Sequence, residues 1–164
     1  MADDVEAALG EMLAARQLTL AVAESCTGGL LGQRITSVGG SSGYFLGGII
    51  SYSDSAKIQQ LGVKPETLER DGAVSAEAAR QMARGVCRVF GAHLGISITG
   101  IAGPEGGSVE KPVGLVFVCV SFGDECDVKE FRFGGGREDI RQQAGEAALE
   151  LATRYLLTST EGMS

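Results

Sequence analysis

The sequence predicts an α/β fold in which helices cover both faces of a mixed, mainly parallel sheet. Three apolar runs of strand length are each followed by a segment whose apolar residues recur at helical spacing. Two further runs flank Gly123-Asp124, a dipeptide that predicts a hairpin, and a long helical pattern follows them. Strands that alternate with helices, followed by a C-terminal hairpin and helix, are typical of a single layered α/β/α domain.

The first half of the chain contains two predicted strands, each followed by a helical segment. Strands and helices are told apart here by the period of their apolar residues, and Ser53 or Asp54 is a suitable N-cap. We expect helices over 4–16, 27–36 and from the cap to Leu61, strands over 18–23 and 44–52, and a turn or helix from Pro65.

The second half begins with a longer helix that Ser75 can cap and Gly91 can end, because glycine accepts the left-handed conformation at a helix C-terminus. The apolar alternation in the second hairpin arm changes phase between Val128 and Phe131, which predicts a β-bulge. The other expected elements are a strand over 94–99, a glycine-rich loop over 100–111, hairpin arms over 112–122 and 125–133, and a helix over 137–157.

Length and charge limit the classes of protein. A chain of 164 residues is predicted to form one domain, with its core over about residues 5–157. The net charge of -7 predicts no nucleic-acid or membrane partner. The acidic N-terminus lacks the features of a signal peptide, and no apolar run is long enough for a membrane helix. Four cysteines without a CxxC pair favour reduced thiols and a cytoplasmic location.

Histidine is nearly absent, which restricts the chemistry. His93 is the only one, and its place before an apolar run indicates a histidine at the start of a strand. A zinc site with several histidines is therefore excluded within one chain, and we expect no metal or other cofactor. A Ser-His-Asp triad would also depend on this single residue.

The most informative segment is residues 23–29 (AESCTGG), which places Ser25 on the turn between a predicted strand and a predicted helix. Thr27, Gly28 and Gly29 begin that helix, and its first N–H groups are expected to be free for an anion or a developing oxyanion. This position suits a nucleophile. Cys26 is the competing nucleophile, but the next residue on a turn usually points elsewhere.

Serine needs a base, and with histidine so scarce a lysine is the natural candidate. Lys57 lies in the first turn of its predicted helix, where the helix dipole and partial burial would both lower its pKa. A surface lysine without a function is the alternative. If the first three strands are parallel, Ser25, Tyr52 and Thr99 all follow carboxyl ends at one edge of the sheet.

The other polar residues near these strand ends each allow two interpretations. Tyr52 can hydrogen-bond the amine or relay a proton, or it can simply pack its ring. Thr99 and Gly100 can orient a substrate or stabilise an oxyanion, whereas Thr99 can instead cap the strand. Glu24 can support the serine turn or cap a helix.

The loop over residues 100–107, which includes Gly103, is glycine-rich and can present successive N–H groups to a phosphate. It is neither a P-loop nor a GxGxxG fingerprint, because the GK[ST] end and the strand–helix frame are missing. Arg137 follows three glycines at the start of the last helix. It is either a phosphate ligand or a solvated arginine.

Three motifs in this order resemble the CinA C-terminal domain family. They are residues 23–29 (AESCTGG), residues 51–52 (SY) followed by Lys57, and residues 98–104 (ITGIAGP), and the resemblance spans roughly residues 5–157. It implies hydrolysis of nicotinamide mononucleotide to nicotinate mononucleotide and ammonia, a reaction of pyridine nucleotide (NAD) salvage. It also implies a homo-oligomer, a dimer or higher.

By the same resemblance, Ser25 is the nucleophile, Lys57 is its base, and Tyr52 and Thr99 support them, while the family pattern around Arg137 is looser. Larger relatives carry an N-terminal domain linked to nucleotide pyrophosphatase activity, which we do not expect here. Two other readings stay open: a non-catalytic nucleotide-binding module, and an interaction protein associated with competence or DNA damage. Salt-sensitive retention on duplex DNA would favour the latter.

Overall fold

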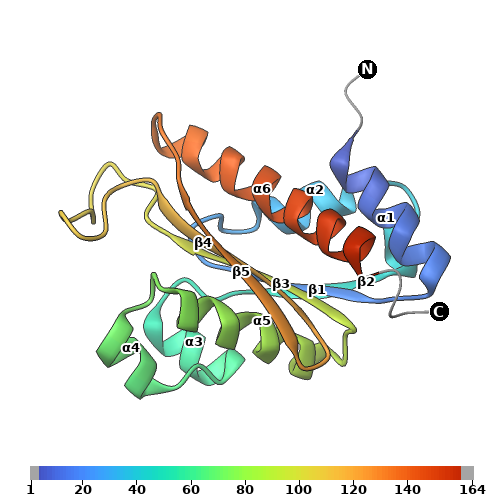
Figure 1. Ribbon diagram of the computed structural model, residues 1–164, viewed down its shortest axis with the longest axis horizontal. Helices are drawn as coiled ribbons and strands as arrows, with labels where there is room; N and C mark the ends of the chain where they lie inside the picture. The colour runs from blue at the N-terminus through green and yellow to red at the C-terminus, as the bar shows by residue number, and fades with distance from the viewer. Residues whose placement is uncertain (1–3, 160–164) are drawn as a thin grey trace.

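The computed structural model describes residues 4–159, which form three layers with one sheet between two sets of helices (Figure 1). The strands are β1 (Leu20–Glu24), β2 (Phe45–Ile50), β3 (Leu94–Gly100), β4 (Leu115–Phe122) and β5 (Glu125–Arg132). They lie in the order β2-β1-β3-β4-β5. β1 is parallel to both β2 and β3, whereas β4 is antiparallel to β3 and to β5. The predicted fold class, a mixed sheet with a hairpin and a last helix, is confirmed.

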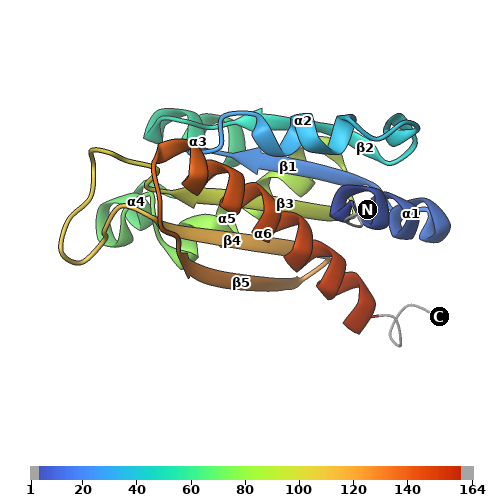
Figure 2. The same cartoon turned by 90° about the horizontal axis from the view of Figure 1, so that it is seen from above.

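The helices divide between the two faces of the sheet (Figures 1 and 2). One face carries α1 (Val5–Arg16), α2 (Leu30–Thr36) and α6 (Arg137–Thr158), and the other carries α3 (Asp54–Leu61), α4 (Pro65–Asp71) and α5 (Ala76–Phe90). Within residues 4–159 none of these helices combines the length and apolar character that crossing a membrane requires.

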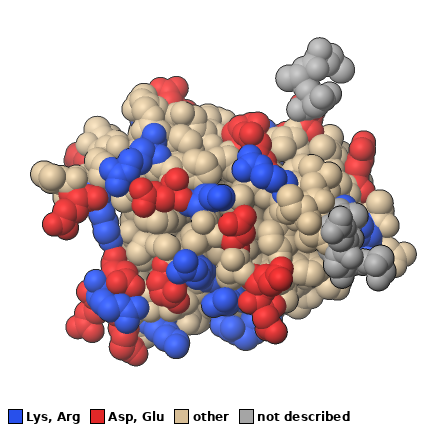
Figure 3. Space-filling view, in the orientation of Figure 1, with Lys and Arg blue, Asp and Glu red and all other residues tan. Residues whose placement is uncertain are grey.

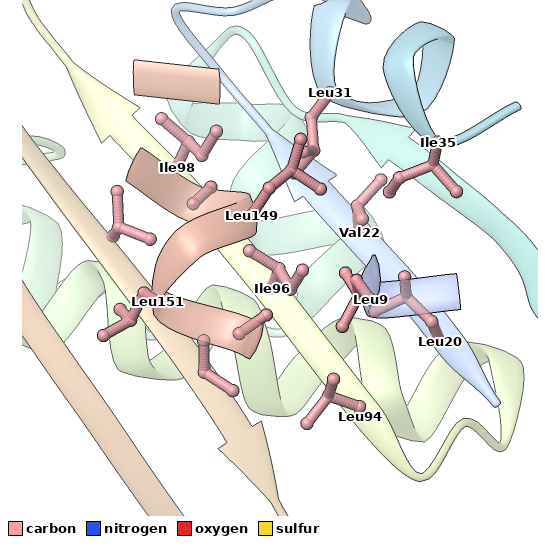
Figure 4. Close-up of a cluster of buried hydrophobic side chains, with 14 of the residues drawn as sticks. Leu9, Leu20, Val22, Leu31, Ile35, Leu94, Ile96, Ile98, Leu149 and Leu151 are labelled. Atoms are coloured by element: carbon pink, nitrogen blue, oxygen red, sulfur yellow. The ribbon is translucent and has the colours of Figure 1, made fainter. Parts of the chain in front are cut away.

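The largest part of the core lies between the sheet and the layer of α1, α2 and α6. Leu9, Val22, Ile96 and Leu149 come from four different elements and meet there, fully buried (Figure 4). Every residue of β1 is buried, as expected for a central strand covered by helices on both faces. The position of the β1 carboxyl end is therefore fixed by packing on both sides.

Close packing on the opposite face fixes α3. A Cβ atom at Gly85 of α5 would lie 2.0 Å from the carbonyl oxygen of Leu61, so α3 can approach α5 only because this residue is glycine. Gly95 of β3 allows α5 to lie close to the sheet in the same way, since a Cβ atom there would lie 2.5 Å from the carbonyl oxygen of Ala83 in α5. The position of α3 relative to the strand ends thus depends on small residues in its neighbours.

Capping residues set the helix boundaries as predicted. The Ser53 hydroxyl accepts a hydrogen bond from the Ala56 N–H, which makes Ser53 rather than Asp54 the N-cap of α3. Ser75 caps α5 in the same way through Ala78, and Gly91 ends that helix with a φ of 66°. The expected turn or helix after Pro65 is the helix α4.

Two local predictions are wrong. The second helix begins at Leu30 rather than at residue 27, because residues 26–29 form a turn. The bulge expected between Val128 and Phe131 is absent, since the β4–β5 register runs without interruption from Leu115–Arg132 to Phe122–Glu125. β5 is an edge strand with no fully buried residue, so its apolar residues need not keep one phase. An irregularity in register lies instead between β1 and β2, next to Leu20.

Candidate active site

Ser25 and Lys57 are in direct contact. The Nζ atom of Lys57 lies 2.9 Å from the Oγ atom of Ser25, although the two residues are 32 positions apart. Lys57 is 1% exposed and Ser25 is 8% exposed, so the pair is shielded from bulk water. The parallel strands β1 and β2 cause this meeting, because both chains turn at the same edge of the sheet.

The amine of Lys57 has three oxygen partners. It donates to the carbonyl oxygens of Ser51 at 2.6 Å and Tyr52 at 3.4 Å, and its third partner is Ser25. A neutral amine has two N–H groups and one lone pair. If the two carbonyls take both N–H groups, the lone pair points to the Ser25 hydroxyl and can accept its proton.

Burial lowers the pKa of Lys57 from its usual value, because the protonated form loses its hydration. The negative charge of Asp54, at the start of the same helix, opposes this effect and raises the pKa, and Cys26 does so to a smaller extent. The sequence-based expectation of a lowered pKa has the correct direction. Its main cause is loss of hydration.

The backbone of the serine turn is held in place from both sides. The Ser25 N–H donates to the Ile98 oxygen of β3 at 3.0 Å, and the Ser25 oxygen accepts from the Gly28 N–H at 3.1 Å. Gly28 and Gly29 have φ angles of 58° and 113°, which glycine adopts without strain. The two glycines therefore shape the turn that presents Ser25.

Glu24 occupies the start of α2. Its carboxylate accepts hydrogen bonds from the N–H groups of Gly29 at 3.2 Å, Leu31 at 3.0 Å and Gly32 at 2.9 Å, and from the Thr27 hydroxyl at 2.6 Å. An acidic group at the positive end of a helix is favourable. The prediction that these N–H groups are free for an oxyanion is wrong, because Glu24 already binds them.

Glu24 and Thr27 are thus satisfied within the protein rather than facing a ligand. Both are buried, at 2% and 0% exposure, and neither lines the cavity above Ser25, nor do Gly28 and Gly29. The expected contact of Thr27, Gly28 and Gly29 with an anion therefore stays a prediction, and the contacts that the structure shows for Glu24 and Thr27 are structural ones. Glu24 has both of the roles considered for it, because its carboxylate caps α2 and also holds the turn that carries Ser25.

Arg141 of α6 also fixes this turn, and no local pattern in the sequence indicates it. Its Nε atom donates to the Cys26 oxygen at 3.1 Å and one terminal nitrogen donates to the Thr27 oxygen at 2.9 Å. Glu138, one turn earlier, pairs with the same guanidinium at 2.5 Å. More than a hundred residues separate Arg141 from the turn, so only the fold brings them together.

A cavity of about 270 Å³ opens above Ser25 and Lys57. Seven of the predicted site residues line it: Ser25, Tyr52, Lys57, Thr99, Gly100, Gly103 and Arg137. The loop after β3 and the start of α6 form its walls, so three strand ends and one helix start meet there. Cys26 and Glu105 also line the cavity, and the sequence predicts no binding role for either of them.

Arg137 and Tyr52 form the outer wall of this cavity. One terminal nitrogen of Arg137 donates to the Gly103 oxygen at 2.6 Å, and the other donates to the Tyr52 hydroxyl at 3.1 Å. Tyr52 is 60% exposed, so its ring does not pack in the core. The structure thus favours a role for Tyr52 at the cavity over the alternative of a packed aromatic ring.

Thr99 lies at the floor of the cavity and is fixed by its own hydrogen bond. Its hydroxyl donates to the Ala73 oxygen at 2.8 Å, which ties the end of β3 to the segment before α5. Thr99 is 1% exposed. The side chain therefore shapes the cavity, and its hydroxyl proton is already engaged.

The competing candidates are less suitable. Burial raises the pKa of the Cys26 thiol to about 11, so Cys26 is protonated at neutral pH and is a poor nucleophile. His93 lies at the start of β3, where its Nδ1 atom accepts from the Thr19 N–H at 3.0 Å. This is the amino end of the strand, whereas Ser25 follows the carboxyl end of the neighbouring strand.

Comparison with known proteins agrees with the motifs. The profile of the CinA C-terminal domain matches residues 2–156. A protein of Moorella thermoacetica described as competence-damage inducible is 54% identical over 97% of this chain, and a CinA-like protein of Syntrophomonas wolfei is 56% identical over 84%. The matches cover only 38% and 33% of those proteins, so the chain spans little more than a third of their length.

A solved structure has the same fold. The crystal structure of a CinA superfamily protein from Klebsiella pneumoniae superimposes with a TM-score of 0.91 and 32% sequence identity, covering 94% of this chain and 96% of the other. The chain belongs to the CinA C-terminal domain family.

Proposed function

We propose that the protein is an amidohydrolase that converts nicotinamide mononucleotide to nicotinate mononucleotide and ammonia with a Ser-Lys pair. The observation that carries the proposal is the 2.9 Å contact between Ser25 Oγ and Lys57 Nζ within a shielded cavity. A serine next to a buried lysine whose pKa is lowered has the composition of a nucleophile and base. The substrate follows from the family resemblance.

In the first step, the neutral Lys57 amine takes the proton of Ser25 as Oγ attacks the carboxamide carbon. The carbonyl oxygen then becomes negative and needs a donor. The Cys26 N–H is suited to this role, because it follows the nucleophile and, within residues 4–159, donates to no backbone oxygen. The carbonyl oxygen of Ser25 accepts a hydrogen bond from the Gly28 N–H. The Cys26 N–H belongs to the same trans peptide group as that carbonyl, so it points in the opposite direction.

In the second step, the carbon–nitrogen bond breaks and the amide nitrogen leaves as ammonia, taking the proton that Lys57 received. A Ser25 ester of the nicotinate group remains. Water then attacks this ester while Lys57 accepts one of its protons, and that proton returns to Ser25 Oγ as the acid is released. The ammonium form of Lys57 is stabilised by the Ser51 carbonyl at 2.6 Å.

Arg137 is the proposed partner of the substrate phosphate. Its guanidinium lines the cavity and lies at the start of α6, where the helix dipole also favours an anion. The Gly100 and Gly103 backbone lines the same wall. A phosphate bound there would compete with the Tyr52 hydroxyl for Arg137, which would free Tyr52 to contact the reacting group.

Release of ammonia from nicotinamide mononucleotide tests the proposal. We expect the native chain to release ammonia, and Ser25→Ala and Lys57→Met to lower kcat by at least about 10³-fold, since each removes a reacting group. Ser55→Ala, an exposed serine of α3, is the matched control and should retain full activity. No ammonia from the native chain would refute this reaction, and full activity in Ser25→Ala would refute the nucleophile.

A second candidate is a non-catalytic role in competence or the response to DNA damage, which the description of the Moorella thermoacetica relative suggests for that protein. A nucleotide-binding module would use the same cavity without turnover. Binding of nicotinamide mononucleotide with no release of ammonia would favour that reading. Acidic and basic side chains are interspersed on the face shown in Figure 3, which gives no support to direct DNA contact there.

The location and assembly of the protein are also proposals. The four cysteines are unpaired, which agrees with a reducing compartment such as the cytoplasm. We expect a homo-oligomer, a dimer or higher, from the family resemblance. Sedimentation of the purified chain would test this second point directly.

A further inference from the structure

The cavity carries charges of both signs. Arg137 contributes a positive charge, and Glu105 is the only carboxylate that lines it among residues 4–159. Glu24, the nearest acid in sequence to Ser25, is turned to α2 and does not reach the cavity. A site built only for a phosphate would gain nothing from a carboxylate, because like charges repel.

Glu105 is not neutralised by Arg137. In the described part of the chain no ion pair joins them, and Arg137 donates to the Gly103 oxygen and the Tyr52 hydroxyl. Glu105 is exposed and follows Gly103 and Pro104 in the loop that forms one wall of the cavity. The carboxylate is thus available to a ligand on the same wall that Arg137 fixes.

A ligand that satisfies both groups must itself carry both charges. Nicotinamide mononucleotide does so, because its pyridinium ring is a cation and its phosphate is an anion. The 1,4-dihydro form of nicotinamide mononucleotide has the same amide, ribose and phosphate, but its dihydropyridine ring is neutral. The two forms therefore differ at the feature that a carboxylate can recognise.

We infer that Glu105 is a specificity residue that selects substrates whose amide is borne by a positively charged ring, an inference that rests on the proposed amidase function. Glu105 acts through charge and not through the chemical step. Because the group is exposed, its effect on binding is moderate: about 5-fold in Kd at low salt, as expected for a screened pair of unit charges.

The test measures equilibrium binding to protein that carries Ser25→Ala, so that turnover does not interfere. Nicotinamide mononucleotide is compared with its 1,4-dihydro form, with and without Glu105→Gln. We expect Glu105→Gln to weaken binding of the cationic form about 5-fold and not to weaken binding of the dihydro form, whose remaining phosphate charge a carboxylate only repels. Glu105→Asp keeps the charge and should retain most of the discrimination.

Two controls separate charge from structure. Glu110 is an exposed residue of the same loop, and its side chain does not line this cavity. Glu110→Gln should therefore leave the Kd of nicotinamide mononucleotide and the Kd of its dihydro form unchanged. Raising the salt from about 0.05 to 0.5 M should reduce the difference between the two ligands for the native loop and not for Glu105→Gln. An equal effect of Glu105→Gln on both ligands, or no effect on either, would overturn the assignment.

The outcome also distinguishes this inference from the proposed reaction. If the native chain releases ammonia but Glu105→Gln does not discriminate, only the role of Glu105 is wrong. If no ammonia is released but the cationic ligand is favoured through Glu105, the reaction is wrong and the charge selection stands. If neither mononucleotide binds, the pair 1-methylnicotinamide and nicotinamide repeats the comparison, and failure of both to bind refutes the selection as well.

Discussion

At the scale of single residues, the protonation of Lys57 decides when Ser25 can be activated. Only the neutral amine can accept the serine proton, so kcat/KM should rise with pH through the pKa of Lys57. Burial lowers that pKa and the charge of Asp54 raises it. The variant Asp54→Asn removes the raising effect, so the acidic limb of the pH profile should move to lower pH.

The pH profile of ammonia release measures this shift. The control Glu69→Gln removes an exposed acid of α4, away from the serine, and should leave the profile in place. A shift of the limb to higher pH in Asp54→Asn would contradict the assignment of Lys57 as the base, because a group with the opposite dependence would then limit the rate.

Glu24 is the residue whose loss should damage the turn most. In Glu24→Gln, one oxygen is replaced by an amide NH₂ that faces N–H groups of α2, and the favourable charge at the helix start is lost. We expect a loss of about 2–3 kcal/mol in the free energy of unfolding, or roughly 5–10 °C in Tm. Activity should fall as well, since the same residues shape the turn around Ser25.

Thermal unfolding followed by circular dichroism provides the measurement. Glu11→Gln is the matched control, because Glu11 is an exposed residue of α1. Its Tm should stay within about 1–2 °C of the native value, as is usual for a surface substitution. If Glu24→Gln were equally stable, the hydrogen bonds between Glu24 and α2 would contribute little to the fold.

At the scale of elements, the distance between Ser25 and Lys57 depends on how α3 sits on α5. Gly85→Ala would place a methyl group 2.0 Å from the Leu61 oxygen, so the two helices must separate or shift. Overpacking of this kind costs about 1–3 kcal/mol. Because α3 carries Lys57, we expect kcat to fall by more than the change in folded fraction explains.

Activity and unfolding measured on the same preparation separate the two effects. Gly39→Ala is the control, because an added Cβ there meets no atom within 4 Å. It should change neither stability nor rate by much. Full activity in a destabilised Gly85→Ala protein would show that the position of α3 does not control the Ser25–Lys57 contact.

The elements also show which features a sequence can predict. Strand and helix boundaries followed from apolar periodicity and from caps such as Ser53 and Ser75, which act within four residues. Local patterns do not decide between the two roles of Glu24, because its bonds to backbone N–H groups reach five to eight residues forward across a turn. Arg141 was missed entirely, since its partners are about 115 positions away.

At the scale of the whole molecule, the parallel order of β1, β2 and β3 is what assembles the site. The serine turn, Lys57 and Thr99 come from three separate segments, and only a shared carboxyl edge makes them neighbours. This much was predictable once the strands were taken as parallel. The sequence does not predict which of the side chains near these strand ends face the cavity, because Thr27 and Glu24 bind each other instead of a ligand.

The charge of the whole molecule predicts its behaviour toward DNA. A protein with a net charge of -7 gains little from counterion release and should not be retained on duplex DNA, even at about 0.05 M salt. Fluorescence anisotropy with a labelled duplex of about 30 base pairs, over protein concentrations up to about 100 μM, measures this; non-specific binders reach Kd values of about 10⁻⁴–10⁻⁶ M. Binding that weakens steeply with added salt would contradict the prediction and favour the competence-related reading. Ser25→Ala carries the same net charge, so its anisotropy curve should match the native one, and DNA contact, if found, would be independent of the catalytic serine.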